Sequence, residues 1–207
     1  ANDIDLASIE RLTMVACGTA FYAALTAKYW FEKIARVPVE VDVASEFRYR
    51  EPPVAPGTSA LFVSQSGETA DTLAALRYMT LQNATIISVV NVPESSIARE
   101  SDLVLPLHAG VEIGVASTKA FTTQLVALQL LTLSLGRHTG LDAALEKQLV
   151  ENLHELPSLC QRVLALDPVI EKMSEAFANK HHALFLGRGE HYPIALEGAL
   201  KLKEISY

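Results

Sequence analysis

The sequence predicts an α/β fold, a doubly wound parallel five-stranded sheet, followed by the start of a second domain of the same type. Short apolar runs of the buried-strand kind alternate with helical patterns along the chain. The loops between them are short, as in repeated strand–helix units that build a parallel sheet. A strand, a glycine turn and a helix recur near the C-terminal end. Residues 1–140 are therefore expected to form the first domain, and 141–207 a helical connection and the N-terminal part of a second.

The elements of the first domain follow from apolar and β-branched runs separated by turn residues. The expected strands are 12–16, 37–43, 59–63, 85–90 and 103–105. The expected helices are 19–35, 44–49, 67–81, a single turn at 95–99, and 118–137. Three prolines and a glycine mark 51–57 as a loop.

Beyond Gly140 the pattern becomes mainly helical. Residues 141–166 are expected to be helical with a break near Pro157, because proline disrupts a helix interior. Asp167 and Pro168 read as an N-cap followed by a first-turn proline, opening a helix to about residue 179. A buried strand at 182–186, a tight turn at 187–190 and a helix at 192–206 complete the prediction.

Composition excludes several classes of function. The net charge of −7 argues against nucleic acid or an anionic membrane surface as a partner. The most apolar stretch, 125–135, is shorter than the roughly 20 residues of a membrane span. The two cysteines are far apart, so no disulfide framework is expected, and a cytoplasmic location is favoured. None of the six histidines has metal-ligand spacing with carboxylates or cysteines, so no metal site is predicted.

Residues 64–69, Ser-Gln-Ser-Gly-Glu-Thr, are the most informative segment of the chain. They follow an apolar run and precede a helical pattern, so the hydroxyls of Ser64, Ser66 and Thr69 lie near a helix N-terminus, where a phosphate is favoured. The loop contains no lysine or arginine, so hydrogen bonds would have to hold the anion. Glu68 is expected in the first helical turn, where it complements the dipole. The alternative is an ordinary turn with capping hydroxyls.

Two further turns are candidates for the same site. Cys17, Gly18 and Thr19 end the first strand, and ligands of open α/β sheets bind beyond the carboxyl ends of strands. If strands one and three are neighbours, this turn lies beside the serine loop, and the pair favours a phosphate site over two ordinary turns. Cys17 lacks a nearby base and is interpreted as a pocket-lining residue rather than a nucleophile. Ser117 and Thr118 are interpreted as an N-cap pair, or alternatively as a turn that covers the ligand.

Glu197, Lys201 and Glu204 are spaced to share one face of the last helix. A carboxylate beside an ammonium can move protons when the pair is partly buried, because burial and charge shift pKa values. A solvated surface ion pair is the alternative, and from spacing alone it is the commoner arrangement.

These segments together resemble a known family. Residues 64–69 resemble the signature of sugar isomerase (SIS) domains, which bind phosphosugars. Together with Cys17-Gly18-Thr19, 44–50, 114–122 and 195–207, they resemble the isomerase half of the glucosamine-6-phosphate synthases, the isomerizing glutamine–fructose-6-phosphate aminotransferases. The resemblance covers nearly the whole chain and implies a flavodoxin-like SIS fold.

The resemblance implies an enzyme that aminates fructose 6-phosphate at C2 and isomerises it to glucosamine 6-phosphate. It implies a cytoplasmic homodimer without a cofactor, whose ammonia comes from glutamine hydrolysed by a separate glutaminase domain of the same protein. The implied phosphate ligands are Ser64, Gln65, Ser66 and Thr69. The residues implied to line the sugar site are Cys17, Gly18, Thr19, Val115 and Ser117. The implied catalytic residues are Glu204, Lys201 and Glu197. Glu204 would carry a proton between C1 and C2, with Lys201 assisting and Glu197 supporting it.

The sequence departs from the family in what it omits. The glutaminase domain, the ring-opening histidine from a neighbouring subunit and the Schiff-base lysine near the family's C-terminus are not in it, so the chain alone is not expected to catalyse the full reaction. Two other classes stay open. A non-enzymatic phosphosugar sensor would keep the serine loop without needing Glu204 and Lys201. A related SIS enzyme, such as a deglycase, would use similar residues on another substrate.

Overall fold

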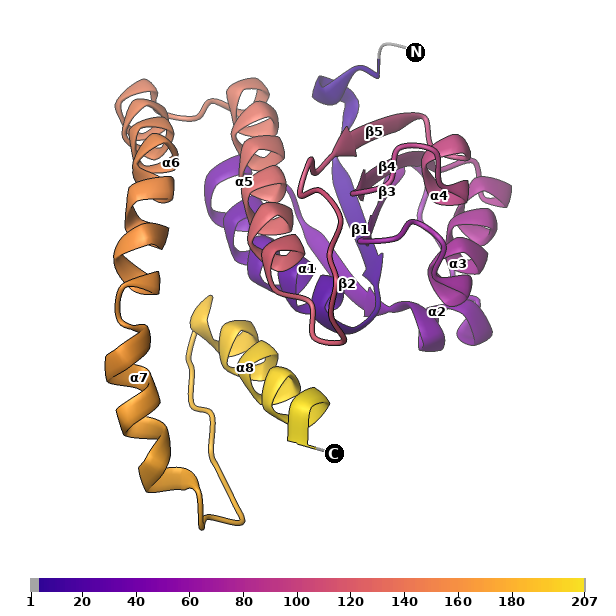
Figure 1. Ribbon diagram of the computed structural model, residues 1–207. Helices are drawn as coiled ribbons and strands as arrows, with labels where there is room; N and C mark the ends of the chain where they lie inside the picture. The colour runs from indigo at the N-terminus through magenta and orange to yellow at the C-terminus, as the bar shows by residue number, and fades with distance from the viewer. Residues whose placement is uncertain (1–3, 207) are drawn as a thin grey trace.

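The computed structural model describes residues 4–206 and shows the predicted α/β architecture (Figure 1). Within these residues the strands form one five-stranded parallel sheet in the order β2-β1-β3-β4-β5. The strands are β1 (Arg11–Ala16), β2 (Val39–Val43), β3 (Thr58–Ser64), β4 (Thr85–Val90) and β5 (Leu103–Pro106). All five predicted strands of the first domain are confirmed, and β1 lies beside β3. Tyr207, the last residue of the motif at 195–207, lies outside the described residues.

Both faces of the sheet are buried, which explains the continuous apolar runs of its strands. Successive side chains point to opposite faces. Met14 and Leu61 face one apolar core, whereas Val15 and Phe62 face the other, and all four side chains are fully buried.

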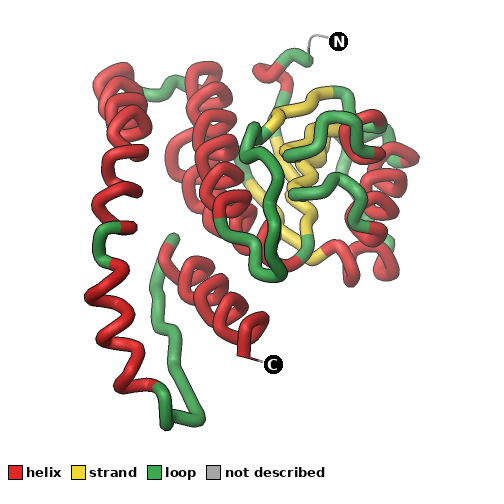
Figure 2. The backbone as a smooth tube through the Cα atoms, viewed as in Figure 1, coloured by secondary structure: helices red, strands yellow, loops and turns green. Residues whose placement is uncertain are grey.

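Helices cover the two faces of the sheet in two layers (Figures 1 and 2). One layer contains α1 (Gly18–Trp30), its π-helical extension η2 (Phe31–Ala35) and α5 (Lys119–Thr139). The other contains α2 (Ala44–Arg50), α3 (Ala70–Leu81) and the short α4 (Ser96–Arg99). A single 3-10 turn, η1 (Leu6–Ser8), precedes β1. The sequence therefore identified each of these α-helices, with differences at their ends.

The C-terminal third consists of α6 (Ala143–Leu164), α7 (Asp167–Ser174), the 3-10 turn η3 (Glu175–Phe177) and α8 (His191–Ser206). The expected break at Pro157 is wrong, because α6 continues through it and ends only at Leu164. Pro157 is exposed, so water can satisfy the carbonyl that loses its helical donor. Asp167 begins α7 rather than capping it, and Leu166 holds the N-cap position. None of the helices described between residues 4 and 206 is long and apolar enough to cross a bilayer.

The buried strand expected at 182–186 does not form among the described residues. This segment is an extended loop that runs from the end of η3 toward α8 (Figure 2), and Leu184 and Leu186 are 88% and 87% exposed. A buried strand needs a neighbouring strand for its backbone and a cover for its side chains. Residues 4–206 provide no partner strand at this position and leave both leucines uncovered, although Phe185 between them packs against Gly198 of α8.

Candidate ligand-binding site

A cavity of about 250 Å³ opens where β1 and β3 end. The chain leaves these adjacent strands toward opposite faces of the sheet, into α1 and α3, so the position is the switch point where open α/β sheets bind ligands. The predicted site residues that line the cavity are Cys17, Thr19, Ser64, Gln65, Ser66, Thr69 and Ser117. Gly18, the first residue of α1, is not among the lining residues, and neither is Val115, whose side chain is 87% exposed.

The serine loop, residues 64–69, presents hydroxyl groups that can donate hydrogen bonds into the cavity. The Gly67 N–H donates to Ser64 Oγ at 3.0 Å, and the Glu68 N–H donates to Ser66 Oγ at 3.2 Å. A hydroxyl that accepts a backbone hydrogen bond keeps its own hydrogen for another partner. Ser64 Oγ also lies 3.4 Å from Thr69 Oγ1. The loop therefore offers hydrogen-bond donors to the cavity, as an anion requires.

The helix after this loop begins later than predicted. Gly67 has a φ of +66°, and α3 starts at Ala70 rather than at residue 67. Glu68 consequently lies outside α3, and the expectation that it complements the α3 dipole is wrong. Its carboxylate instead accepts the Ser96 N–H at 2.7 Å, at the start of α4, and this bond lowers the pKa of Glu68. Glu68 thus ties the serine loop to α4.

Ala20 and Val63 complete the lining with apolar groups, and the two polar cavity residues that were not predicted are Thr72 from α3 and Gln124 from α5. Each is 1% exposed, and within residues 4–206 Thr72 Oγ1 and Gln124 Oε1 have no hydrogen-bond partner. Buried polar atoms without partners are costly, so a bound ligand or ordered water in the cavity would satisfy them. The sequence held a signal for Gln124, because an amide interrupts the apolar pattern of α5.

The turn before α5 is organised by Glu112, which the sequence analysis did not single out. Its Oε1 accepts the backbone N–H of Thr118 at 2.8 Å and of Ala120 at 3.3 Å, and its Oε2 accepts the Ser117 hydroxyl at 3.0 Å. Thr118 holds the N-cap position, but its side chain does not cap the helix, so the predicted Ser117–Thr118 cap is wrong. Burial raises the pKa of Glu112, but the hydrogen bonds from Thr118, Ala120 and Ser117 outweigh it and leave the pKa lowered.

The three candidate catalytic residues meet on α8, which packs against α1. The Thr19 hydroxyl donates to Glu197 Oε1 at 3.0 Å and accepts from Lys201 Nζ at 2.9 Å. The same ammonium lies 3.3 Å from Glu197 Oε1 and 2.6 Å from Glu204 Oε2. Glu197 is 5% exposed, so the cluster is not the solvated surface pair that spacing alone favoured. Through Thr19, which also lines the cavity, α8 is joined to the candidate site.

Burial determines the titration of Glu197. Removal from water raises the pKa of this carboxyl, and the hydrogen bond from Thr19 and the charge of Lys201 oppose the shift without cancelling it. The folded protein therefore binds this proton more tightly than the unfolded chain does.

Glu197→Gln is expected to remove part of the pH dependence of stability. Because the pKa of Glu197 is raised in the folded state, this residue favours folding when the pH is below its ordinary pKa of 4.5. The contribution is lost as the pH rises through the pKa of the folded state. As the pH rises over this range, the free energy of unfolding of the wild type should therefore fall relative to that of Glu197→Gln. Urea unfolding of both proteins from pH 4.5 to pH 7 measures the difference. Glu171→Gln, at an exposed position of α7, is the control. If the free energy of unfolding depends on pH identically in Glu197→Gln and wild type, the raised pKa of Glu197 is contradicted.

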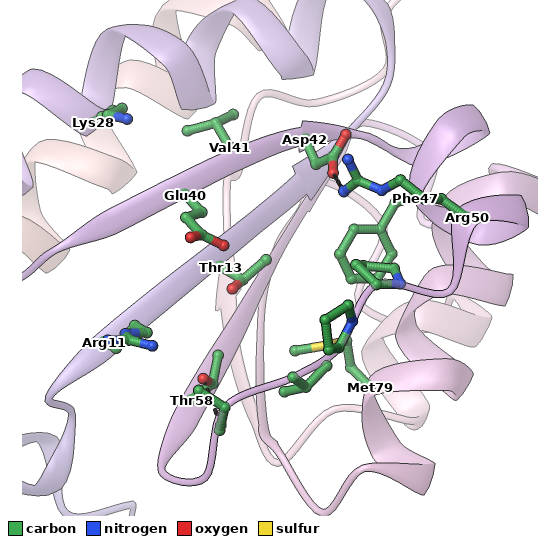
Figure 3. A pocket seen from close by; sticks show the side chains of 14 residues that line it. Arg11, Thr13, Lys28, Glu40, Val41, Asp42, Phe47, Arg50, Thr58 and Met79 are labelled. Atoms are coloured by element: carbon green, nitrogen blue, oxygen red, sulfur yellow. Dashed lines mark hydrogen bonds and ion pairs between the residues drawn. The ribbon is translucent and has the colours of Figure 1, made fainter.

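A second hollow, of about 440 Å³, lies along the edge of the sheet, over β1 and β2 and beside the loop at 52–55 (Figure 3). Arg11 and Thr58, the first residues of β1 and β3, line it, and Arg50 pairs with Asp42 at its rim. It extends along β2 as far as Asp42, and its lining includes neither a predicted site residue nor the turns after β1 and β3, where such sheets bind ligands. The cavity at the serine loop is therefore the candidate site.

The fold and the cavity define an open α/β protein with a hydroxyl-lined site at the switch point of its sheet. The chain belongs to the SIS domain family, whose model matches residues 5–134. Over its full length it is 57% identical to glutamine–fructose-6-phosphate aminotransferase [isomerizing] from Brucella abortus, and over 97% of its length it is 58% identical to the enzyme of that name from Pseudomonas syringae pv. tomato. It spans 34% and 33% of these relatives, about a third of their length.

Solved structures agree with this assignment. The C-terminal domain of glucosamine-fructose-6-phosphate aminotransferase from Francisella tularensis matches with a TM-score of 0.95 and 50% identity, over 98% of this chain and 58% of that one. A glucosamine-6-phosphate deaminase from Thermotoga maritima matches with a TM-score of 0.73 and 26% identity, over 92% of this chain and 56% of that one. The predicted SIS fold is thereby confirmed.

Proposed function

We propose that this chain is the phosphosugar-binding part of an isomerizing glutamine–fructose-6-phosphate aminotransferase, with fructose 6-phosphate as substrate and glucosamine 6-phosphate as product. One observation carries the proposal. A cavity rich in free hydroxyl donors is joined, through Thr19, to a partly buried Lys201 that contacts two carboxylates. The identity to aminotransferases of this name supports the choice of substrate.

The serine loop would hold the phosphate group. Ser64 and Ser66 offer hydroxyl hydrogens, and the N-terminus of α3 adds the favourable field of a helix dipole. The net charge of −7 opposes an anionic ligand, so hydrogen bonds at this position must outweigh the field of the whole protein. Hydrogen bonds to a charged acceptor are about twice as strong as neutral ones, which meets that need.

The α8 cluster would perform the isomerisation. Once C2 carries the amine as a protonated imine, Glu204 can take a proton from C1 to give an enolamine and return that proton to C2, while the C1 hydroxyl releases its hydrogen to solvent and becomes the aldehyde. The Lys201 ammonium lies 2.6 Å from Glu204 and would place positive charge beside the C1 oxygen, on which negative charge develops as the hydroxyl loses its proton. Glu197 would hold Lys201 in position from the buried side.

The whole reaction would need parts outside this chain, which spans about a third of the relatives it matches. We assign 1–140 to the first SIS domain and 141–207 to the connection and the start of a second. The exposed apolar side chains of Leu184, Leu186 and Ile170 support this division, because they would pack against further structure. A glutaminase domain of the same protein, a second subunit and a cytoplasmic location belong to the same proposal.

The phosphate assignment predicts the effect of removing the two serine hydroxyls. Ser64→Ala/Ser66→Ala is expected to weaken binding of fructose 6-phosphate by about 100-fold, because two hydrogen bonds to a charged group are lost. Calorimetric titration of the intact protein that contains this chain measures the affinity. Ser158→Ala, at an exposed site on α6, is the matched control. Equal affinity of the double variant and wild type would refute the assignment.

A related SIS enzyme is the second candidate, because the chain also resembles a glucosamine-6-phosphate deaminase. That similarity is 26% identity, against 50% for the aminotransferase domain. The two activities differ in the direction of nitrogen transfer. Ammonia released from glucosamine 6-phosphate without glutamine turnover would favour the deaminase. The non-enzymatic sensor is disfavoured, because it has no use for the buried cluster on α8.

A further inference from the structure

Ser117 faces the cavity with a hydrogen-bond polarity opposite to that of the serine loop. Its hydroxyl donates to Glu112 Oε2 at 3.0 Å, whereas the oxygens of Ser64 and Ser66 accept backbone N–H groups. A serine hydroxyl has one hydrogen and two lone pairs. Ser117 therefore offers a ligand only lone pairs, and the serine loop offers hydrogens.

Glu112 enforces this polarity because it is held as an acceptor. The N–H groups of Thr118 and Ala120 both point at its Oε1, and an ionised carboxylate has no hydrogen to donate. These hydrogen bonds keep its pKa below the ordinary value, so the carboxylate is charged at neutral pH. Ser117 then has no alternative but to donate to it.

We propose that Glu112 is a positioning residue that makes Ser117 an acceptor for a sugar hydroxyl and so sets the direction in which a phosphosugar lies in the cavity. The phosphate faces the serine loop, and a hydroxyl-bearing carbon faces Ser117. The charge on Glu112, directly behind Ser117, also disfavours the reversed orientation, because it repels a phosphate at that end. This inference rests on the proposed function and names how its site discriminates the two ends of the substrate.

Glu112→Gln tests the inference, because the amide nearly matches the carboxylate in shape but differs in polarity. Its oxygen can still accept from Thr118, and its NH₂ group then faces Ser117, whose oxygen becomes the acceptor of that pair. Calorimetric titration of the intact protein uses two probes, fructose 6-phosphate and inorganic phosphate. We expect fructose 6-phosphate to bind about three- to tenfold more weakly, because Ser117 then donates to the sugar hydroxyl and the hydrogen of that hydroxyl loses its acceptor; binding of inorganic phosphate should be unchanged.

A double-mutant cycle separates this role from the capping of α5. Ser117→Ala is expected to weaken fructose 6-phosphate binding alone, and Glu112→Gln is expected to add nothing in the Ser117→Ala background. Equal weakening of both probes by Glu112→Gln, or an undiminished effect in that background, would show that Glu112 acts only on the helix and would overturn the inference. If Glu112→Gln does not fold, Ser117→Ala decides, because unchanged fructose 6-phosphate affinity overturns the inference as well.

Failure of the inference about Glu112 can be distinguished from failure of the proposed function. If that function is wrong, wild type does not bind fructose 6-phosphate, or Ser64→Ala/Ser66→Ala binds it as well as wild type. If only the inference is wrong, the serine variant loses affinity as expected while Glu112→Gln does not separate the two probes.

Discussion

Replacement of Gly67 by alanine is expected to lower the free energy of unfolding by about 2–5 kcal/mol and to abolish binding at the serine loop. Two costs combine at this residue. Its φ of +66° is unfavourable for any residue with a Cβ, and an added Cβ would lie 2.0 Å from Ser95 Oγ and 2.4 Å from Ser95 Cβ. The Gly67 N–H also donates to Ser64 Oγ, and its carbonyl accepts from Ile97. A shift of this backbone would therefore displace the phosphate donors.

Two further variants separate these costs. Gly57→Ala has the same kind of backbone strain, with a φ of +76°, but nothing within 4 Å of the added Cβ. The positive φ alone should therefore lower the free energy of unfolding of Gly57→Ala, by about 1–2 kcal/mol. Ser95→Gly removes both clashing atoms, so Gly67→Ala/Ser95→Gly should be more stable than Gly67→Ala once the cost of Ser95→Gly alone is subtracted. Urea unfolding and calorimetric titration measure the two effects. Equal stability of Gly67→Ala and Gly57→Ala would contradict the steric argument.

The sheet was predictable because its strands are short, apolar and separated by turn residues. Buried parallel strands need apolar side chains on both faces, and β1, β3 and β4 show this directly in the sequence. The position of the site followed from one further step, because the turns after β1 and β3 can share a cavity only if the strands are adjacent. The register between Met14 and Leu61 shows that they are.

The parts of the site that depend on contacts between distant segments were not predictable. Glu68 looks like a first-turn carboxylate, but its partner Ser96 lies 28 positions along the chain. Thr19 and Glu197 are 178 positions apart, and no local pattern relates them. Glu112 lies only six positions from Thr118, but it caps the helix across an irregular loop whose path the sequence does not reveal. The first two cases depend on tertiary packing, which local propensity does not encode, and the third depends on the conformation of an irregular loop.

The wrong strand at 182–186 has a different cause. Its apolar run is a valid local signal, but a strand is stabilised only by pairing with another strand and by burial. In the described structure Leu184 and Leu186 face solvent instead. The apolar run therefore indicates that this segment favours a strand, but the strand forms only where a neighbouring strand can pair with it.

Lys201→Met is expected to lower the free energy of unfolding by about 3 kcal/mol, because it leaves the buried Glu197 carboxylate without its cation. The value is at the lower end for a broken buried ion pair, since the side chains of Lys201 and Glu197 are 22% and 7% exposed. If the proposed function holds, turnover of fructose 6-phosphate should also fall by about 10²–10³-fold, as the charge that stabilises the developing oxyanion is removed. Urea unfolding and steady-state kinetics on the intact protein provide the two measurements.

The controls for Lys201→Met lie on the same helix. Lys203→Met, two residues further along α8 at an exposed position, should change neither measurement appreciably. Glu197→Gln/Lys201→Met should recover part of the stability, because a neutral amide costs less to bury than an unpaired carboxylate, but it should recover no turnover. Stability regained without activity would show that Lys201 has two separable roles, to neutralise Glu197 and to act on the substrate. If Lys201→Met unfolds as wild type does, the Lys201 charge does not stabilise the Glu197 carboxylate, and the α8 cluster is not a buried ion-paired unit.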